Sequence, residues 1–280
     1  MDFFNSITLI VFLPTIGALA LAFFPSRKDE EGVNEAENKN LLLMATLAIT
    51  LITFAVTVGV FLLSGDARFH SNTADMQKAF SVDWIPAFDI HFAMGLDGIS
   101  FPLIMLTTGI SALAVGASWS IKKHLKAYCI LFLLLETGML GVFLALDFFL
   151  FYVFWEVMLL PMYFLIGIWG GPRREYAAIK FFLYTLLGSV LMLIAILVLY
   201  FASDLTKLEP GTLATLNLHE NVVAEVLAVQ ADGDGNHAPI HTFNLLALAE
   251  IGQNTDCFNP TVQWWCFLLL FIGFLVKVPS

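Results

Sequence analysis

Charged residues are scarce in this chain of 280 residues. Only 13% are Asp, Glu, Lys or Arg, against roughly a quarter in a typical globular domain. Hydrophobic residues make up 59%, and the mean hydropathy is +0.84. Because the apolar residues come in blocks of about 20, the length of a bilayer-spanning helix, the chain is predicted to lie in a membrane. This excludes a soluble dehydrogenase, a nuclease or other nucleic-acid-binding protein, and a secreted disulfide scaffold.

The chain also lacks the sequence signatures of cofactors. It contains no phosphate-binding loop, no dinucleotide-binding fingerprint, no haem-binding pair of residues and no run of iron–sulfur cysteines. Its three cysteines have no metal-ligand spacing and are interpreted as small apolar residues: Cys129, Cys257 and Cys266. We therefore expect no cofactor and no redox chemistry in this chain.

Two weak metal patterns lie near residue 235. The stretch 232–236 resembles the opening of a calcium loop, but His237 and Phe243 stand where such a loop needs Gly and Glu. His237 and His241 are four residues apart, yet Pro239 lies between them and no third ligand is evident. Solvated loop histidines are the favoured interpretation, and no metal is expected.

Six complete apolar blocks and the start of a seventh run along the chain. They lie at about 3–24, 41–63, 98–119, 127–146, 148–170 and 177–202, and from about 262 onward. The predicted fold class is an all-α, polytopic membrane protein with six complete transmembrane helices and the first part of a broken seventh. We divide it into 1–126, with three spans and a long connection at 64–97, and 127–280, with the remaining spans and a connection at 203–261.

Cations are distributed unequally between these connections. The first, third and fifth hold nine of the thirteen: Arg27, Lys28, Lys39, Lys122, Lys123, Lys126, Arg173, Arg174 and Lys180. The second, fourth and sixth hold three: Arg68, Lys78 and Lys207. Because Lys and Arg near span ends are retained in the cytoplasm, the N-terminus and both long connections are expected on the non-cytoplasmic side. No cation precedes Arg27, so the first block is expected to stay as a span rather than be cleaved as a signal.

Three ionisable residues lie deep inside the apolar blocks, namely Glu136, Glu156 and Lys277. A charge at the centre of a membrane helix costs at least ~2.5–3.5 kcal/mol, so such residues indicate function by default. A rise of about 1.5 Å per residue places them ~12–22 Å below the surface at which their blocks begin, in the middle third of the bilayer core.

Glu156 is the strongest candidate for a proton-carrying site. Tyr152 and Tyr163, four residues before and seven after it, share its face on a continuous helix and offer hydroxyls to a water chain. Pro161 lacks an N–H and leaves the carbonyl of Val157 without its helical partner. The alternative is a protonated glutamate that only joins helices.

Lys277 is interpreted as a switchable proton carrier. Burial disfavours the charge of an ammonium group and a nearby carboxylate favours it, so movement of the carboxylate makes the lysine bind or release a proton. Pro279 cannot donate to the carbonyl of Leu275, and broken helices at membrane depth line watery cavities. A static ion pair is the alternative.

Two further residues are weaker candidates. Glu136 is followed by Thr137 and Gly138, small residues that allow close helix approach, and a structural acid is as well supported as a proton site. Lys180 shares a helix face with Tyr184 at the cytoplasmic end; it is either the inner mouth of a proton path or an interfacial anchor.

Several stretches of the chain resemble a known family. The similarity lies in four runs: 95–100, 147–170, 176–185 and 277–279. The run 147–170 contains the sequences Phe-Trp-Glu and Leu-Pro-Met-Tyr-Phe. In these runs the chain is similar to the subunit M (chain 4) family of proton-pumping NADH:quinone oxidoreductase, respiratory complex I. The resemblance covers most of the chain from about Gly95 on, apart from 203–261.

This resemblance implies that Glu156 is the family's essential glutamate of the fifth helix and Lys277 the lysine of its broken seventh helix, and that the two form an ion pair. It also implies a subunit without cofactor, partnered by the antiporter-like subunits L and N in a bacterial inner membrane or an equivalent energy-transducing membrane. Family members have about fourteen helices in two inverted repeats, so the sequence is expected to be the N-terminal portion only.

Two other functions remain open at this stage. A multi-subunit sodium/proton antiporter or a membrane-bound hydrogenase uses the same helices. A non-transporting structural or assembly subunit would use its buried charges only to fix helix register. The identity of the subunits that co-purify with this chain distinguishes the first alternative from complex I. Transport measurements distinguish the second alternative from a proton-translocating subunit.

Overall fold

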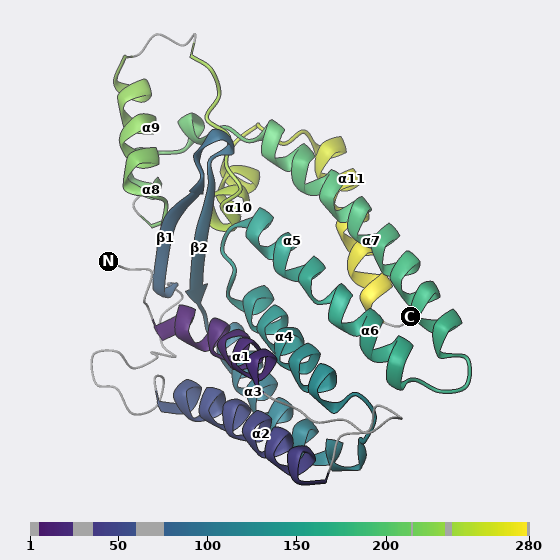
Figure 1. Ribbon diagram of the computed structural model, residues 1–280. Coiled ribbons are helices and arrows are strands. Elements are labelled where there is room, and N and C mark those ends of the chain that lie inside the picture. The colour runs from purple at the N-terminus through teal and green to yellow at the C-terminus, as the bar shows by residue number, and fades with distance from the viewer. Residues whose placement is uncertain (1–5, 25–35, 60–75, 214, 233–236, 279–280) are drawn as a thin grey trace.

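The computed structural model describes residues 6–24, 36–59, 76–213, 215–232 and 237–278. Its long helices form a slanted bundle (Figure 1): α1 Ser6–Phe23, α2 Ala36–Val58, α3 Ser100–Ala117, α4 Leu125–Leu144, α5 Phe148–Val157, α6 Leu159–Trp169, α7 Arg174–Ala202 and α11 Pro260–Lys277. Seven helical segments in this described part are long and apolar enough to cross a membrane, with α5 and α6 counted together. The prediction of an α-helical polytopic membrane protein is confirmed.

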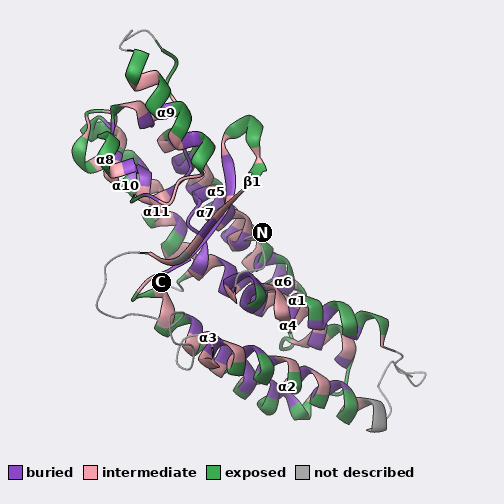
Figure 2. Ribbon diagram, turned by 90° about the vertical axis from the view of Figure 1, so that its left-hand side faces the viewer, coloured by how far each residue is buried: buried purple, intermediate pink, exposed green. Residues whose placement is uncertain are grey.

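The bundle is apolar on the outside and partly polar on the inside. Leu113, Leu187 and Phe267 are each more than half exposed, and Figure 2 shows exposed residues along the outer faces of α2 and α3. In contrast, four threonines of α2 at helical spacing are buried: Thr46, Thr50, Thr53 and Thr57. Large exposed apolar surface indicates contact with lipid or with other membrane helices.

The fifth span is not one continuous helix. Residue Met158 separates α5 from α6. Pro161 explains the break, because its ring excludes the helical hydrogen bond to Val157 one turn earlier and crowds that carbonyl. The last turn of α5 therefore has carbonyl groups that need other partners, and these lie beside Glu156.

Both long connections fold at one end of the bundle. The first forms a hairpin of β1 Gln77–Ile85 and β2 Ile90–Leu96, joined by a short 3-10 helix at Pro86–Phe88. The second contains α8 Pro210–Leu213, α9 Glu220–Asp232 and α10 Leu245–Asn254. The hairpin is regular structure that the sequence interpretation did not anticipate, although Phe80 and Val82 alternate with polar residues as in a strand.

A shared core joins the two connections to the bundle. Ile90 of the hairpin packs in one buried cluster with Tyr200 of α7, Val226 of α9 and Ile251 of α10. The hairpin is also tied to the link between α4 and α5, where the Leu146 amide donates to the Ala93 carbonyl over 2.9 Å. This end of the bundle therefore contacts the start of α5 directly.

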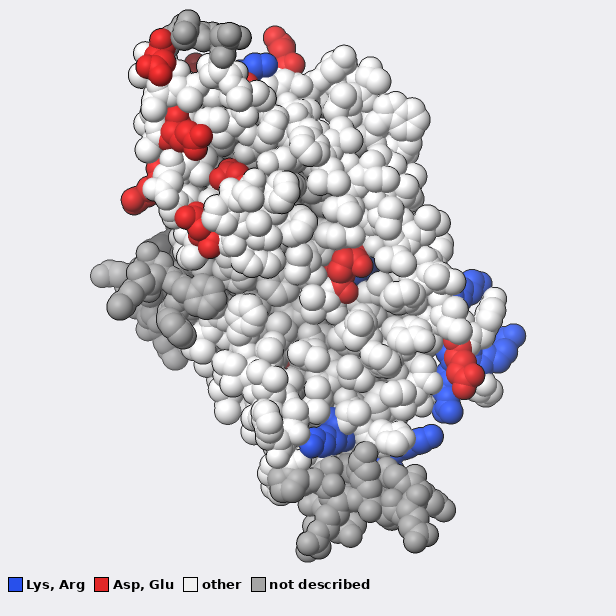
Figure 3. All heavy atoms as spheres, turned by 45° about the horizontal axis from the view of Figure 1, so that its top comes forward, with Lys and Arg blue, Asp and Glu red and all other residues white. Residues whose placement is uncertain are grey.

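The described residues beside the first, third and fifth connections lie together at the opposite end. The Lys39 ammonium donates to the Trp119 carbonyl, and the Lys126 ammonium donates to the carbonyls of Ala22 and Phe24. Figure 3 shows most Lys and Arg toward this end and most Asp and Glu toward the end with α8 to α10. Arg27, Lys28 and Arg68 lie outside the described residues.

Candidate functional site

Lys277 lies at the middle depth of the bundle. It is the last residue of α11, which packs along α7. The close approach is fixed by glycines: Gly273 faces the backbone of Gly188, and Gly188 faces the side chain of Val276. Because Gly188 is near the midpoint of the 29-residue α7, the end of α11 is far from both ends of the bundle. Figure 1 shows α11 running alongside α7.

The helix α11 ends where the sequence predicted a break. Val278 has an extended backbone with φ −82° and ψ 112°, the conformation that a following proline favours. Pro279 itself lies outside the described residues.

The ammonium of Lys277 is held by Trp155. Its Nζ donates a hydrogen bond of 2.8 Å to the Trp155 carbonyl oxygen and lies 4.0 Å from the centre of the indole ring. The carbonyl belongs to the last turn of α5, where the helix break leaves acceptors free. A charged hydrogen bond contributes about 1.5–3 kcal/mol, and an aromatic face adds further attraction for a cation.

Glu156 is the next residue and is half-buried. Its charge acts on Lys277, but the direct ion pair that the family resemblance implied is not formed here. Among the described lysines and carboxylates no nitrogen and oxygen atoms lie within 4.0 Å of each other. The physical reason is the competing acceptor, since the Trp155 carbonyl binds the ammonium instead.

Tyr152 and Tyr163 have different surroundings. The hydroxyl of Tyr152 approaches Ser189 of α7 and feels the charge of Glu156, so it lies between the helix with the acid and the helix that packs on α11. Tyr163 lies beyond the break, on α6, and its ring packs edge-on against Phe182 with centroids 5.6 Å apart. The expected common face assumed an unbroken helix, which the structure does not have.

Glu136 lies in a separate part of the bundle, on α4 where it packs against α1 and α3. It is fully buried, and neither carboxyl oxygen has a hydrogen-bond partner of good geometry. The Ser111 hydroxyl of α3 approaches it, and the neighbouring Thr137 shares a 2.7 Å hydrogen bond with Thr15 of α1. These hydroxyls offer polar neighbours but no counter-charge.

We expect Glu136→Gln in the full-length protein to assemble and to lose far less stability than the ~3–5 kcal/mol of a broken buried ion pair, because no counter-charge among the described residues is paired with the carboxyl group. A glutamine amide occupies the same volume, is neutral, and keeps the contact with Ser111. Glu136→Lys is the contrasting variant, since it buries a cation with no partner. A large loss of stability in Glu136→Gln, measured by thermal unfolding in detergent, would show that the carboxylate is ionised and paired.

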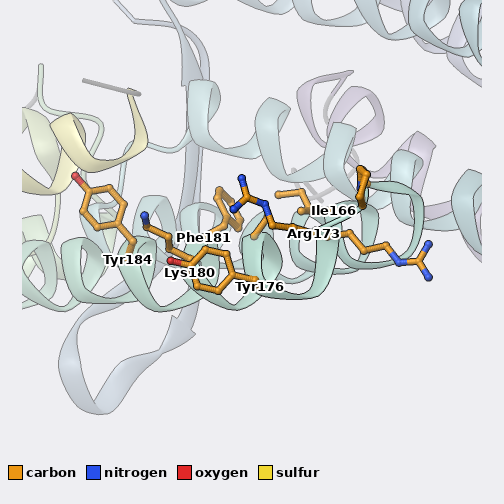
Figure 4. A pocket seen from close by; sticks show the side chains of 11 residues that line it. Ile166, Arg173, Tyr176, Lys180, Phe181 and Tyr184 are labelled. Carbon is orange, nitrogen blue, oxygen red and sulfur yellow. The ribbon is translucent and has the colours of Figure 1, made fainter.

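Lys180 lies away from the other candidates, on the exposed surface of α7 near the cation-rich end. Its Nζ is 5.9 Å from the centre of the Tyr176 ring. It lines an open hollow of about 1270 Å³ together with Arg173, Arg174 and Tyr184, and Figure 4 shows Lys180 between Tyr176 and Tyr184. The structure does not bring Lys180 into contact with Glu156 or Lys277. Both interpretations of Lys180, the inner entrance of a proton path and an interfacial anchor, agree with this position.

His237 and His241 of the weak metal pattern have different surroundings. The Nδ1–H of His241 donates to the Ser203 carbonyl over 2.7 Å, and His237 is exposed. No group of three metal-ligand side chains occurs in the ranges that the structure describes. Residues 233–236 of the calcium-like stretch lie outside those ranges.

Two residues of the site were missed from the sequence. Trp155 was not considered, because a backbone acceptor becomes free only when the helix breaks. Asp147 caps α5, accepting hydrogen bonds from the amides of Phe149 and Leu150 at 2.9 and 3.0 Å. An aspartate immediately before an apolar run is a sequence signal for a helix start, so Asp147 was predictable in principle.

Comparison with known proteins points to one family. The family described as NADH:quinone oxidoreductase/Mrp antiporter, transmembrane, matches residues 145–231, which include Asp147, Glu156 and Lys180. NADH-quinone oxidoreductase subunit M of Rhodobacter capsulatus is 42% identical over 204 residues, covering 73% of this chain and 37% of that protein. The subunit M of Rickettsia typhi is 30% identical over 278 residues, covering 98% of this chain and 46% of that protein.

A third relative is chain 4 of the NADH-ubiquinone oxidoreductase of Prototheca wickerhamii, 40% identical over 205 residues, covering 72% of this chain and 39% of that protein. This chain thus spans between 37% and 46% of the length of the three relatives.

Two solved structures share the fold. A chain of respiratory complex I from Thermus thermophilus with bound NADH matches with a TM-score of 0.66 at 22% identity, over 98% of this chain and 44% of that chain. A chain of the Mrp complex from Dietzia sp. DQ12-45-1b matches with a TM-score of 0.54 at 19% identity, over 97% of this chain and 27% of that chain. At these identities the likeness concerns the fold alone.

Proposed function

Because this chain belongs to the NADH:quinone oxidoreductase/Mrp antiporter membrane family and is homologous to NADH-quinone oxidoreductase subunit M, we propose that it moves protons through an energy-transducing membrane as part of an NADH:quinone oxidoreductase. Oxidation of NADH and reduction of quinone take place in other subunits. The chain itself carries no cofactor and no metal, and contributes titratable groups along a path through the helices.

The observation that carries this proposal is the position of Lys277. A lysine at mid-depth of a seven-span bundle, held by the Trp155 carbonyl and adjacent to Glu156, has the chemistry of a proton carrier. In the transfer step the Lys277 ammonium gives a proton to the Glu156 carboxylate through water. One N–H bond breaks and one O–H bond forms, leaving a neutral amine and a neutral acid.

The surroundings of Lys277 support a proton transfer that occurs only in one of two positions of the ammonium group. With Lys277 bound to Trp155, the two charges are near each other but not in contact. A small movement of α5 relative to α11 brings the ammonium to the carboxylate or away from it, and the balance between burial and pairing changes accordingly. The hydroxyls of Tyr152 and Ser189 lie beside Glu156 in this region.

Glu136 and Lys180 have secondary roles in this proposal. Glu136 is a second buried acid that holds a proton within the first four spans. Lys180 exchanges protons with water at the cation-rich end, which the distribution of Lys and Arg assigns to the cytoplasm. The N-terminus and both folded connections then lie on the non-cytoplasmic side of a bacterial inner membrane or its equivalent.

The partners in this proposal are other membrane subunits. The structures that share the fold are multi-subunit complexes, and the exposed apolar faces of the bundle require lipid or further helices. We assign the antiporter-like subunits L and N as its neighbours within the complex.

A second candidate function is sodium/proton exchange in an Mrp-type antiporter, favoured by the shared family and by the similar fold of the Mrp complex. The purified complex containing the full-length subunit, reconstituted in liposomes and supplied with NADH and quinone, distinguishes the two. We expect proton uptake, followed with a pH-sensitive dye, to be unchanged in sodium-free buffer. Uptake that requires sodium ions, or proton movement without any dependence on NADH, contradicts the proposal.

A further inference from the structure

A cluster of titratable side chains lies outside the spans, at the end of the bundle where the hairpin and the helices α8 to α10 lie. His91 and Asp83 are cross-strand partners in the hairpin, and Asp89 lies in the turn between the strands. His91 Nε2 is 2.9 Å from an Asp89 carboxylate oxygen, and His91 Nδ1 is 3.1 Å from an Asp83 carboxylate oxygen. The imidazole is hydrogen-bonded to Asp89 through Nε2, and the Asp83 carboxylate lies within ion-pair distance of Nδ1 without an aligned hydrogen bond. A carboxylate beside each nitrogen suits the doubly protonated ring.

Another histidine covers this ring. His219, immediately before α9, stacks on His91 with ring centroids 5.6 Å apart and planes inclined by 7°. Its Nδ1 is 3.6 Å from the same oxygen of Asp83. The cluster thus joins the first long connection to the second, and His91 is only 8% exposed.

The cluster is connected to the helix that carries Glu156. The backbone N–H of His91 donates to one carboxylate oxygen of Asp147 over 3.2 Å. The other oxygen of Asp147 accepts from the first amides of α5. A single buried carboxylate therefore bridges the hairpin and the N-terminus of α5.

We propose that His91, Asp83 and Asp89 form a proton-binding site at the non-cytoplasmic end of the protein, electrostatically coupled through Asp147 to the start of α5. The site holds one proton on the imidazole between two carboxylates and exchanges it with the adjoining water phase. When the proton leaves, the imidazole loses its positive charge and one of its two N–H donors, its attraction to the two carboxylates falls, and the contact of the hairpin with α5 weakens. The pH of that compartment thereby acts on the helix of Glu156.

The electrostatics agree with this geometry. Burial by itself lowers the pKa of His91, but the hydrogen bond to Asp89 and the charges of Asp89, Asp83 and Asp147 outweigh it, so the pKa lies above its ordinary value of 6.5. Burial raises the pKa of Asp147 to about 6, against the hydrogen bonds to its carboxylate. From the remaining elements, His219 faces the ring and Tyr200 of α7 lies near Asp89.

The sign of the pH effect follows. A group whose pKa is raised in the folded protein stabilises it fully below its unfolded pKa, and the contribution is lost as the pH rises through the folded value. For His91 the stabilisation of the hairpin is present below about pH 6.5 and disappears at higher pH.

The test is a pH titration of single histidines in the intact complex with the full-length subunit. Deuterium exchange at the imidazole C2 carbon follows a sigmoid in pH whose midpoint is the pKa, and mass spectrometry assigns it to each histidine peptide. We expect the midpoint of His91 to lie above that of the exposed His237. A midpoint at or below that of His237 overturns the proposal.

Carboxylate variants test the site itself. Asp89→Asn keeps the turn, because asparagine tolerates the left-handed backbone found there, with φ 54°. We expect the His91 midpoint to fall by about 1 pH unit, the lower end of the effect of a neighbouring opposite charge. Asp83→Asn should lower the His91 midpoint by less, since the Asp83 side chain is 42% exposed and that of Asp89 27%. If Asp89→Asn does not assemble, a lowered midpoint in Asp83→Asn supports the site and an unchanged midpoint contradicts it.

The link to α5 is tested by Asp147→Asn. Asparagine still caps the helix, but it removes the charge, so the His91 midpoint should fall. The matched control is Asp232→Asn at the exposed end of α9, which should leave the midpoint unchanged. An unchanged midpoint in Asp147→Asn, or an equal shift in the control, contradicts the coupling. None of these readouts depends on proton pumping, so they fail or succeed independently of the proposed function.

Discussion

Replacing Lys277 by methionine is expected to abolish proton translocation through this subunit while the complex still assembles and oxidises NADH. Methionine has a similar length and fills the same space beside Trp155, but it binds no proton. We expect the number of protons moved by this subunit per electron to fall by more than about tenfold. The measurement is dye-detected proton uptake in liposomes at matched NADH oxidation rates.

Lys277→Arg separates the charge of this residue from its proton exchange. An arginine keeps a cation against the carbonyl and ring of Trp155, but in proteins it does not release its proton. The expected result is a complex at least as stable as Lys277→Met and equally unable to pump. Lys207→Met is the control that should pump normally, because Lys207 is exposed in the connection between α7 and α8, outside the spans. Normal pumping by Lys277→Arg would mean that only the positive charge matters, and the carrier role would be wrong.

The spans could be predicted from the sequence because hydropathy and length determine them directly. A stretch of about 20 apolar residues has few alternatives to a membrane helix, and all seven segments were found within a few residues of their positions. The end of the last helix before Pro279 was predicted because a proline removes a specific backbone hydrogen bond, and α11 does end at Lys277. At Pro161 only an unpaired Val157 carbonyl was expected, so the break between α5 and α6 was not predicted.

The partners of the buried charges could not be predicted in this way. Helix periodicity places Tyr152 and Tyr163 on one face of Glu156 only if the helix is continuous, and the break at Met158 removes that basis. Nor does sequence spacing show that Lys277 would bind a backbone carbonyl in preference to a carboxylate. Such contacts depend on how helices separated by more than 100 residues pack against each other.

The His91 cluster illustrates the same limit. Its members come from four separate places in the chain, at 83–91, 147, 200 and 219. Each is unremarkable in its local sequence, since polar residues are normal in a connection. The alternation of Phe80 and Val82 predicts a strand, but only the hairpin register places Asp83 opposite His91.

The close packing of α4 on α5 leads to the second large effect, which we expect from Gly141→Ala. A Cβ atom at Gly141 would overlap the ring of Phe154, which is itself buried. Overpacking of this kind costs about 1–3 kcal/mol, and the ring cannot turn away without displacing α5. In an open helical position the same change stabilises by about 1 kcal/mol. Gly116 in α3 offers that control, because nothing lies within 4 Å of its Cβ position.

The displacement should also reach the proton site. Phe154 precedes Trp155 and Glu156, so a shift of α5 moves the carbonyl that holds Lys277. We therefore expect Gly141→Ala to lower both the unfolding temperature of the purified complex and its proton uptake per electron, with Gly116→Ala lowering neither. Phe154→Leu in the Gly141→Ala background restores space, and the two changes should be strongly non-additive because the residues are in contact. Additive effects, or normal pumping by Gly141→Ala, would show that the position of α5 does not control proton transfer.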